Sequence, residues 1–302
     1  MKSIHNKIAL VTGAASGMGR ATAMEMARKG AHLILVDINE KGLKEVAASI
    51  QRMESRAHII VANLALKEEI ARVAKTALEQ EDHIDILYNN AGVALLEEIK
   101  DTTTEDWEWL VDINMWAPIR LTQALLPHMI ERGTGHIVTT ASVAGLMGAP
   151  MLGAYSVTKF GMVGYSEALR AEVAQYGISV SAVCPGVVRT NLVETIKTPG
   201  VKEGMSKQMD RYPSWIGLDE MEAGKQIVKG IRKNKGFILI AREAKPLWLL
   251  KRISPEATYF MNRLMFKVLR SERDKMRKEQ GTMGSVKVLP VGKNAKSKTN
   301  TA

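Results

Sequence analysis

The chain has 302 residues, 46% of them apolar, which is enough for a large α/β core. Its single cysteine, Cys184, excludes an internal disulfide and suits a reducing compartment such as the cytoplasm. The whole net charge of +10 lies in residues 242–302, with fifteen Lys or Arg and five Asp or Glu, while residues 1–241 are neutral. This distribution argues against a nucleic-acid-binding body.

Short apolar runs alternate with helical patterns from the N-terminus to about residue 240. The predicted strands are Ile8–Val11, Leu33–Val36, Ile59–Val61, Ile84–Tyr88, His136–Thr140, Ser179–Val183 and Phe237–Ile240. The predicted helices are Arg20–Lys29, Glu40–Gln51, Lys67–Gln80, Thr104–Ile130 and Ala154–Gln175. This alternation predicts an α/β fold with a doubly wound parallel sheet of about seven strands and helices on both faces.

The N-terminal apolar run is too short for a signal segment, and no apolar run reaches the roughly 18 residues of a membrane-spanning helix. Residues 191–214 break the alternation after the sixth strand, on the side where ligands bind in such sheets. A mobile lid over the site is one interpretation, and a structural surface excursion is the other.

The C-terminal part has a different character, and we divide the chain into a catalytic domain (1–241), a basic amphipathic helical extension (242–280) and a disordered Lys-rich tail (281–302). Ser254 and Pro255 form a helix start signal. The apolar residues that then recur at helical spacing are Ala257, Phe260, Met261, Leu264, Met265, Val268 and Leu269.

Two interpretations of this extension remain open. It docks on an acidic membrane surface, or it packs on a partner subunit or on the enzyme's own body. Trp248, Leu249 and Leu250, beside Lys251 and Arg252, slightly favour the membrane.

A glycine-rich segment, TGAASGMG at residues 12–19, follows the first strand and opens a helix. Glycine allows the backbone to approach a ligand closely, and the helix N-terminus offers free N–H groups to a pyrophosphate. Asp37, at the end of the second strand, is placed to accept hydrogen bonds from ribose hydroxyls and would repel a 2′-phosphate. The pattern therefore predicts a dinucleotide site that favours NAD over NADP, although Arg20 lies close to the turn.

A candidate catalytic set follows the fifth strand. Tyr155 and Lys159 are four residues apart, so they share a helix face, and a nearby ammonium favours the phenolate. Such a pair beside a cofactor exchanges a proton with an alcohol or a carbonyl. Ser142 is placed to hydrogen-bond the substrate oxygen, and Asn114, inside a predicted helix, is placed to hold a water.

These pieces together resemble the short-chain dehydrogenase/reductase family, whose fold is a Rossmann-type sheet. The matching segments are TGAASGMG at 12–19, Asp37, NNAG at 89–92, Asn114, Ser142, YSVTK at 155–159 and PGVVRT at 185–190. The resemblance implies that Tyr155 is the general acid/base, that Lys159 binds the nicotinamide ribose and lowers the tyrosine pKa, that Ser142 positions the substrate oxygen and that Asn114 anchors a water. No metal is implied.

The resemblance also implies the cofactor-binding residues, namely Gly13, Ser16, Gly17, Met18, Gly19, Asp37, Asn63, Leu64, Asn90, Ala91, Gly92, Tyr155, Lys159, Pro185, Gly186, Val188 and Thr190. Asn63 departs from the aspartate usual in the family, but an amide can still hydrogen-bond adenine. Dimers or tetramers through residues 104–130 and 154–175 are a further implication.

The substrate side is apolar in sequence and contains no Arg cluster. The residues concerned are Val143, Leu146, Met147, Met151, Leu192, Val193, Met205, Met209, Tyr212 and Trp215. We expect a hydrophobic secondary alcohol or ketone, such as a lipid, steroid or retinoid-like compound. An NADP-dependent carbonyl reductase is one alternative, and a non-catalytic nucleotide-binding scaffold is another, although a scaffold predicts a broken Tyr–Lys–Ser set and this set is intact.

Overall fold

A seven-stranded sheet organises the protein in the computed structural model, which describes residues 2–190, 196–199 and 217–279. Every pair of neighbouring strands is parallel, in the order β3-β2-β1-β4-β5-β6-β9. The strands are β1 (Ile8–Thr12), β2 (His32–Asp37), β3 (Ala57–Val61), β4 (Ile86–Asn89), β5 (Gly135–Thr140), β6 (Ile178–Pro185) and β9 (Phe237–Ile240). The order reverses between β1 and β4, which leaves a crevice at the carboxyl ends of the strands.

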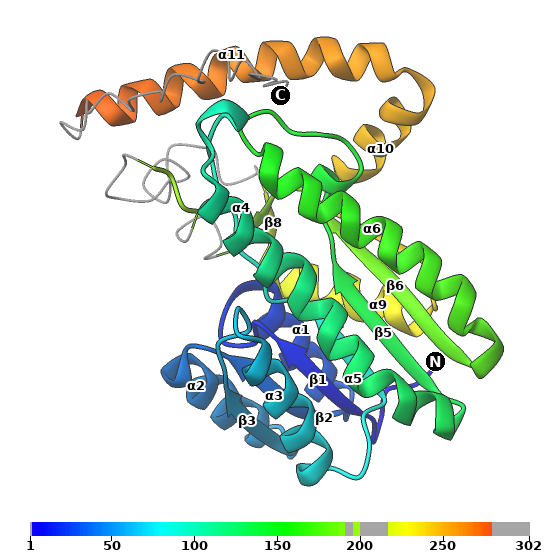
Figure 1. Ribbon diagram of the computed structural model, residues 1–302. Coiled ribbons are helices and arrows are strands. Elements are labelled where there is room, and N and C mark those ends of the chain that lie inside the picture. The colour runs from blue at the N-terminus through cyan, green and yellow to red at the C-terminus, as the bar shows by residue number, and fades with distance from the viewer. Residues whose placement is uncertain (1, 191–195, 200–216, 280–302) are drawn as a thin grey trace, which may run out of the picture.

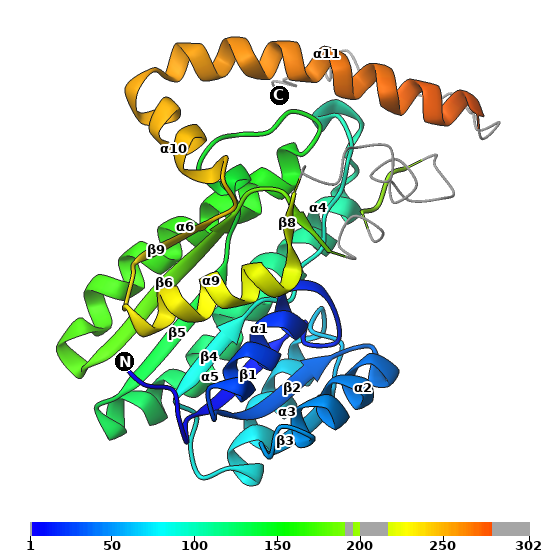
Figure 2. The ribbon, with the colours of Figure 1, turned by 180° about the vertical axis from the view of Figure 1, so that it is seen from behind.

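Helices cover both faces of the sheet (Figures 1 and 2). One layer holds α1 (Gly17–Arg28), α2 (Glu40–Gln51) and α9 (Glu220–Arg232). The other holds α3 (Lys67–Gln80), α5 (Ala117–Arg132) and α6 (Gly153–Val173), with α4 (Thr104–Val111) preceding α5. The expected doubly wound α/β fold is thus confirmed.

All seven predicted strands form. The central strands β1, β4 and β5 are buried throughout, as expected for a parallel sheet covered on both faces, and the edge strands β3 and β9 are partly exposed. The bounds of α2 and α3 agree with the predicted ranges. Helix α1 begins three residues earlier than expected, since the last residues of the glycine-rich segment are already helical. The sequence analysis missed α9 and the small parallel pair β7 (Val188–Arg189) and β8 (Leu218–Asp219).

The predicted helix Thr104–Ile130 is not one regular helix. A π-helical turn, η2 (Asp112–Trp116), separates α4 from α5, and it contains Asn114. Single π-turns inside α-helices occur most often at functional sites. The sequence pattern could not show this turn because an extra residue in one turn barely alters the apolar spacing.

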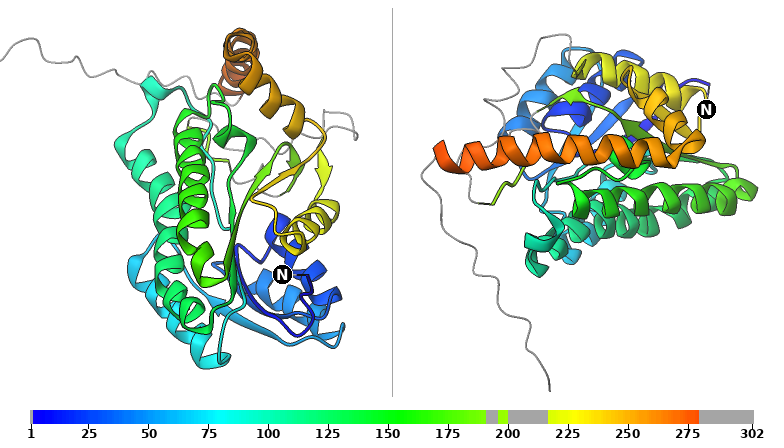
Figure 3. Two further views of the ribbon diagram at one scale, coloured as in Figure 1. Left: turned by 90° about the vertical axis from the view of Figure 1, so that its right-hand side faces the viewer. Right: turned by 90° about the horizontal axis from the view of Figure 1, so that it is seen from above.

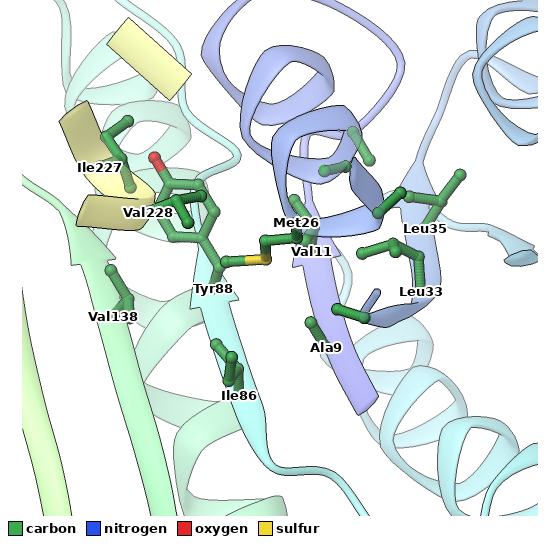
Figure 4. Close-up of a cluster of buried hydrophobic side chains, with 14 of the residues drawn as sticks. Ala9, Val11, Met26, Leu33, Leu35, Ile86, Tyr88, Val138, Ile227 and Val228 are labelled. Carbon is green, nitrogen blue, oxygen red and sulfur yellow. The ribbon is translucent and has the colours of Figure 1, made fainter. Parts of the chain in front are cut away.

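The core between the sheet and the α1–α9 layer is centred on β4. Tyr88 is fully buried there in a cluster that includes Met26, Ile227 and Val228 (Figure 4). The Tyr88 hydroxyl group donates to Asn90 Oδ1 at 3.1 Å and accepts from Thr140 Oγ1 at 3.0 Å. Its hydrogen bonds therefore join the apolar core to the polar ends of the strands.

Two helices follow β9 and lie beyond the carboxyl ends of the strands. Helix α10 spans Ala244–Ile253, and α11 spans Pro255–Glu279 and crosses over the body (Figure 3). The start of α11 agrees with the signal at Ser254 and Pro255. The tail at 281–302 lies outside the described residues, and the division of the chain into three parts stays a prediction.

Buried ion pairs fix α11 to the body. Arg273, only 4% exposed, donates to Glu97 Oε1 at 2.6 Å and to Glu98 Oε1 at 2.8 Å. Arg277 adds a bond to Glu97 Oε2 at 2.5 Å. Glu97 and Glu98 are themselves 3% and 9% exposed, so these carboxylates depend on the guanidinium groups for compensation.

Among the described helices, none is both long and apolar enough to cross a lipid bilayer.

We predict that Arg273→Met detaches α11. The loss of one partner from a buried ion pair costs about 3–5 kcal/mol, so hydrogen exchange of the α11 amides should rise by at least about 100-fold. Hydrogen exchange with mass spectrometry measures the effect. Lys275→Met is the control, because Lys275 is exposed and, among the described residues, forms an ion pair with Glu272 at the surface. Equal α11 exchange in the two variants would contradict the structural role of Arg273.

Candidate active site

A cavity of about 560 Å³ lies at the carboxyl ends of the central strands. It is lined by almost every residue in the predicted catalytic and cofactor-binding sets. The members that line it are Gly13, Ser16, Gly17, Met18, Asp37, Asn63, Leu64, Asn90, Ala91, Gly92, Ser142, Tyr155, Lys159, Pro185, Gly186, Val188 and Thr190. Gly19 and Asn114 lie just behind this wall.

The turn between β1 and α1 can be built only with glycine at two positions. Gly13 has φ +65°, and a Cβ there would lie 2.9 Å from Ala91 Cα. A Cβ on Gly19 would lie 2.0 Å from the Gly13 carbonyl oxygen. The absence of side chains thus lets the turn pack against the end of β4 and leaves its backbone facing the cavity.

The N-terminus of α1 points into the same cavity. Ser16 is its N-cap residue, but no side-chain cap bond and no first-turn acid occur there among the described residues. The first N–H groups of the helix are therefore free to meet an anion, as a pyrophosphate requires. Because these N–H groups face the cavity, the turn that contains Gly13 and Gly17 fits the pyrophosphate of a dinucleotide.

Asp37 lies at the far end of the cavity from the catalytic set. Its Oδ2 accepts from Ala15 N at 3.1 Å, and its Oδ1 accepts from Asn39 N at 2.9 Å. These bonds fix the carboxylate against the glycine-rich turn while it still lines the cavity. Arg20, which the sequence left as a possible counterweight, forms an ion pair with Glu220.

Asn90 connects the ends of three strands. Its Nδ2 donates to Thr12 O at 3.1 Å, at the end of β1, and its Oδ1 accepts from Tyr88 and from Thr140. Thr12 Oγ1 in turn accepts from the main-chain N–H groups of Asn90 and Ala91, at 2.9 and 3.0 Å. The sequence analysis did not assign Thr12 or Tyr88 a role, because a buried polar residue at a strand end carries no pattern of its own.

The candidate catalytic side chains come together as predicted. Ser142 follows β5, and its Oγ accepts from Ala144 N at 3.0 Å, while its hydroxyl is close enough to the Tyr155 phenol to lower the pKa of that phenol. Lys159 is 3% exposed, donates from Nζ to Thr140 O at 2.9 Å and lies 5.5 Å from the centre of the Tyr155 ring.

The pKa values in this group are governed by burial. Burial raises the pKa of the Tyr155 phenol to about 12, opposed by its hydrogen bond with Ser142. Burial also lowers the pKa of the Lys159 amine to about 8. The expectation that Lys159 lowers the tyrosine pKa considered only the charge of the ammonium group, whereas desolvation of the phenolate is the larger effect on Tyr155 in this arrangement.

Asn114 holds the segment after β4 and the start of α6 together. Both its N–H donors are used, on Val93 O at 2.9 Å and Thr158 Oγ1 at 3.2 Å, and its Oδ1 accepts from Val93 N at 2.9 Å. One lone pair of Oδ1 is left for a water molecule. The water-holding role of Asn114 stays a prediction.

The apolar wall differs from the expected one. Val93, Trp109 and Ile113 line the cavity, and none of them was predicted. Four residues that were predicted are not among those that line it, namely Val143, Leu146, Met147 and Met151. The remaining ones, Leu192, Val193, Met205, Met209, Tyr212 and Trp215, lie outside the described residues, as does most of the predicted lid at 191–214.

The fold and this site define a dinucleotide-binding oxidoreductase, and comparisons with known proteins agree. The family model described as short chain dehydrogenase matches residues 7–199. The chain is 35% identical over 258 residues to estradiol 17-beta-dehydrogenase 11 of Mus musculus, covering 84% of this chain and 82% of that protein. This chain belongs to the short-chain dehydrogenase family.

Solved structures give the same result. A short-chain dehydrogenase/reductase from Burkholderia phymatum in complex with NAD has a TM-score of 0.77 at 24% identity, over 85% of this chain and 96% of that one. A short-chain dehydrogenase from Sphingobium yanoikuyae in complex with NADPH has a TM-score of 0.71 at 26% identity, over 83% and 94%. Structural neighbours therefore include binders of either nucleotide.

We predict that Lys159→Met stabilises the protein near pH 7. The amine has a lower pKa in the folded chain, about 8 against 10.5, so the unfolded chain binds the proton more tightly. This destabilises the fold by about 3 kcal/mol below pH 8, and the penalty fades as the pH rises towards 10.5. After the lost hydrogen bond to Thr140 is subtracted, a net gain of about 2 kcal/mol remains.

Urea unfolding at neutral and at alkaline pH measures this gain and its decline. Lys75→Met, at an exposed position, is the control. A Lys159→Met protein that is less stable than the wild type at pH 7 would show that burial of the amine carries no penalty.

Proposed function

We propose that this protein interconverts a hydrophobic secondary alcohol and its ketone with NAD, with Tyr155 as the general acid/base. The observation that carries the proposal is one continuous cavity shared by the buried Tyr155–Ser142–Lys159 group and the glycine-rich turn with Asp37. An NADP-dependent carbonyl reductase working in the opposite direction is the alternative within the same class. A non-catalytic scaffold is disfavoured by the proximity of Tyr155, Ser142 and Lys159.

Each side chain of the site has a role in the proposed reaction that follows from its position. The glycine-rich turn and Asp37 would hold NAD, which would supply the hydride acceptor for the carbinol carbon. Ser142 and the Tyr155 hydroxyl group hydrogen-bond the substrate oxygen, and Tyr155 takes its proton during oxidation or returns it during reduction. Lys159, still protonated at neutral pH, supplies a fixed positive charge near the phenol, and Asn114 with its bound water connects this group to solvent.

The preference for NAD is argued from charge. The Asp37 carboxylate lines the cavity at the end of β2 and would lie against the adenosine ribose, where a 2′-phosphate would be repelled. The positive charge of Arg20 would offset this repulsion, but Arg20 is already paired with Glu220.

The substrate class is argued from the wall beside Tyr155. Val93, Trp109 and Ile113 are apolar, and Leu95 and Leu96 behind them are buried. Lys197, which lies 5.7 Å from the centre of the Trp109 ring, is paired with Asp106. The relative that acts on estradiol, by its name, agrees with an apolar secondary alcohol.

We also propose a homo-oligomer in the cytoplasm. Trp116, Val157 and Phe160 are 45%, 53% and 42% exposed on the α5–α6 side, where the family resemblance implies subunit contacts. Cys184 is fully buried as a free thiol, which suits a reducing compartment.

Tyr155→Phe should lower kcat by about 10²–10⁴-fold. The phenyl ring keeps the packing, so NAD affinity measured by tryptophan fluorescence should change little. Tyr176→Phe, at an exposed tyrosine far from the cavity, is the matched control. Turnover of Tyr155→Phe at the level of this control would refute the acid/base assignment.

Asp37→Ser should raise kcat/KM with NADP relative to NAD by about tenfold or more, since removal of a carboxylate facing the 2′-phosphate relieves about 1.4 kcal/mol or more. Steady-state kinetics with each nucleotide measure the ratio. Asp82→Ser, on the exposed surface, should leave it unchanged. An unaltered ratio in Asp37→Ser would place the ribose elsewhere.

In a series of secondary alcohols of increasing chain length, kcat/KM with NAD should rise about fourfold for each added methylene that enters the cavity, in line with about 0.8 kcal/mol per buried CH₂. A preference for short polyols would rule out the proposed substrate class while leaving the reaction type intact.

A further inference from the structure

Helix α11 has an inner face that is already occupied. Besides the Arg273 ion pairs, Asn262 Nδ2 donates to Gly148 O at 2.6 Å, and Thr258 is 1% exposed. These contacts hold the helix at a fixed orientation against the loops at the carboxyl ends of the strands. Contact with the enzyme's own body, one of the two interpretations of the extension, therefore uses this inner face and leaves Phe260, Leu264 and Val268 exposed.

The outer face carries an apolar stripe. Phe260, Leu264 and Val268 are four residues apart and are 65%, 50% and 61% exposed. Arg273 lies nine residues after Leu264, which is two and a half helical turns, so the stripe points directly away from the ion pairs. Ile253, at the end of α10 next to this helix, is 80% exposed.

Basic side chains accompany the stripe. Arg263 and Lys267 are three residues after Phe260 and Leu264, and neither forms an ion pair within the part of the chain that the structure describes. Lys251 and Arg252 lie 4.5 Å from the ring centres of Tyr259 and Trp248. In total, residues 244–279 hold ten Lys or Arg and four Asp or Glu.

We propose that this outer face, the stripe Phe260–Leu264–Val268 with Arg263 and Lys267, docks the enzyme on an anionic lipid surface. A helix whose apolar stripe is bordered by basic residues lies in the headgroup region of a bilayer, with the cations on anionic lipid. A second copy of the chain is a poorer occupant, because it would bring two strongly basic segments together. The nearest buried acids of the body, Glu97 and Glu98, are already paired with α11.

The position of α11 gives a functional reason for docking on a membrane. The helix lies beyond the carboxyl ends of the strands, the end of the sheet that holds the cavity (Figure 1). An enzyme lying on lipid through α11 would have this end near the membrane, where hydrophobic alcohols concentrate. The docking itself does not depend on the proposed substrate.

Flotation of the full-length protein with vesicles tests the proposal. We expect binding to vesicles of phosphatidylcholine with phosphatidylglycerol, little binding to phosphatidylcholine alone, and weakening by salt. The triple variant Phe260→Gln/Leu264→Gln/Val268→Gln should bind at least tenfold more weakly. Arg263→Gln/Lys267→Gln should also bind about tenfold more weakly.

Matched controls exclude unspecific effects. Leu66→Gln/Lys41→Gln/Lys75→Gln changes exposed apolar and basic side chains far from α11 and should bind like the wild type. Circular dichroism and turnover of a water-soluble alcohol confirm that each variant is folded. Vesicle binding and turnover are separate readouts, so failure of the docking proposal and failure of the proposed reaction are distinguishable.

Four results would overturn the proposal. The wild type does not float with anionic vesicles, or the triple variant floats as well as the wild type. Deletion of 281–302 alone abolishes binding while the stripe substitutions leave it unchanged, which would assign binding to the Lys-rich tail. The triple variant lowers the oligomeric mass in light scattering without a loss of vesicle binding, which would assign the stripe to a second copy.

Discussion

The amine of Lys159 is held almost entirely out of water beside the phenol of Tyr155, and the proposed catalytic site depends on this placement. Burial opposes charge on both groups, so it raises the pKa of Tyr155 to about 12 and lowers that of Lys159 to about 8. Among the described residues, the amine donates a hydrogen bond to Thr140 O at 2.9 Å. A site with this property resists ionisation of the tyrosine until another positive charge arrives next to it, which is what a bound oxidised nicotinamide would contribute.

The surrounding fold stabilises this placement. Hydrogen bonds of Asn90, Thr12 and Thr140 join the ends of β1, β4 and β5 to each other. Tyr88 links this polar group to the apolar core. The glycine-rich turn closes on the same point, where no Cβ would fit. The proposed dinucleotide cradle and the proposed catalytic group therefore share one support, and a displacement of either would disturb the other.

The seven-stranded sheet could be predicted from the sequence because each strand contains a short apolar run between helical patterns, and α2 and α3 because their patterns are regular. Helix α9 also has a readable signal that the sequence analysis overlooked. Asp219 caps it, and Ile227, Val228 and Ile231 follow at helical spacing. The π-turn at Asn114 and the Arg273 ion pairs were not predictable, since the first is a backbone defect without a spacing signature and the second joins residues about 175 positions apart.

Prediction of the site was more complete than prediction of its wall. Gly13, Asp37, Ser142, Tyr155 and Lys159 belong to motifs of fixed spacing, and the structure brings them to one cavity. The apolar wall follows no motif. Trp109 lies on α4 and Ile113 in the π-turn, and Asn114 of that turn is hydrogen-bonded to the main chain of Val93. Substrate preference depends on such packing. The substrate class is therefore proposed from the structure and does not follow from the sequence motifs.

The ionisation of Tyr155 with and without nucleotide tests the account most directly. Ultraviolet difference titration, with Tyr155→Phe as the reference, reports the phenolate of this residue alone. The account predicts a pKa of about 12 for the protein by itself and a value at least about one unit lower with NAD bound, a shift that Lys159→Met reduces. The same pKa in both conditions, or a phenol that already ionises near neutral pH without NAD, would contradict it.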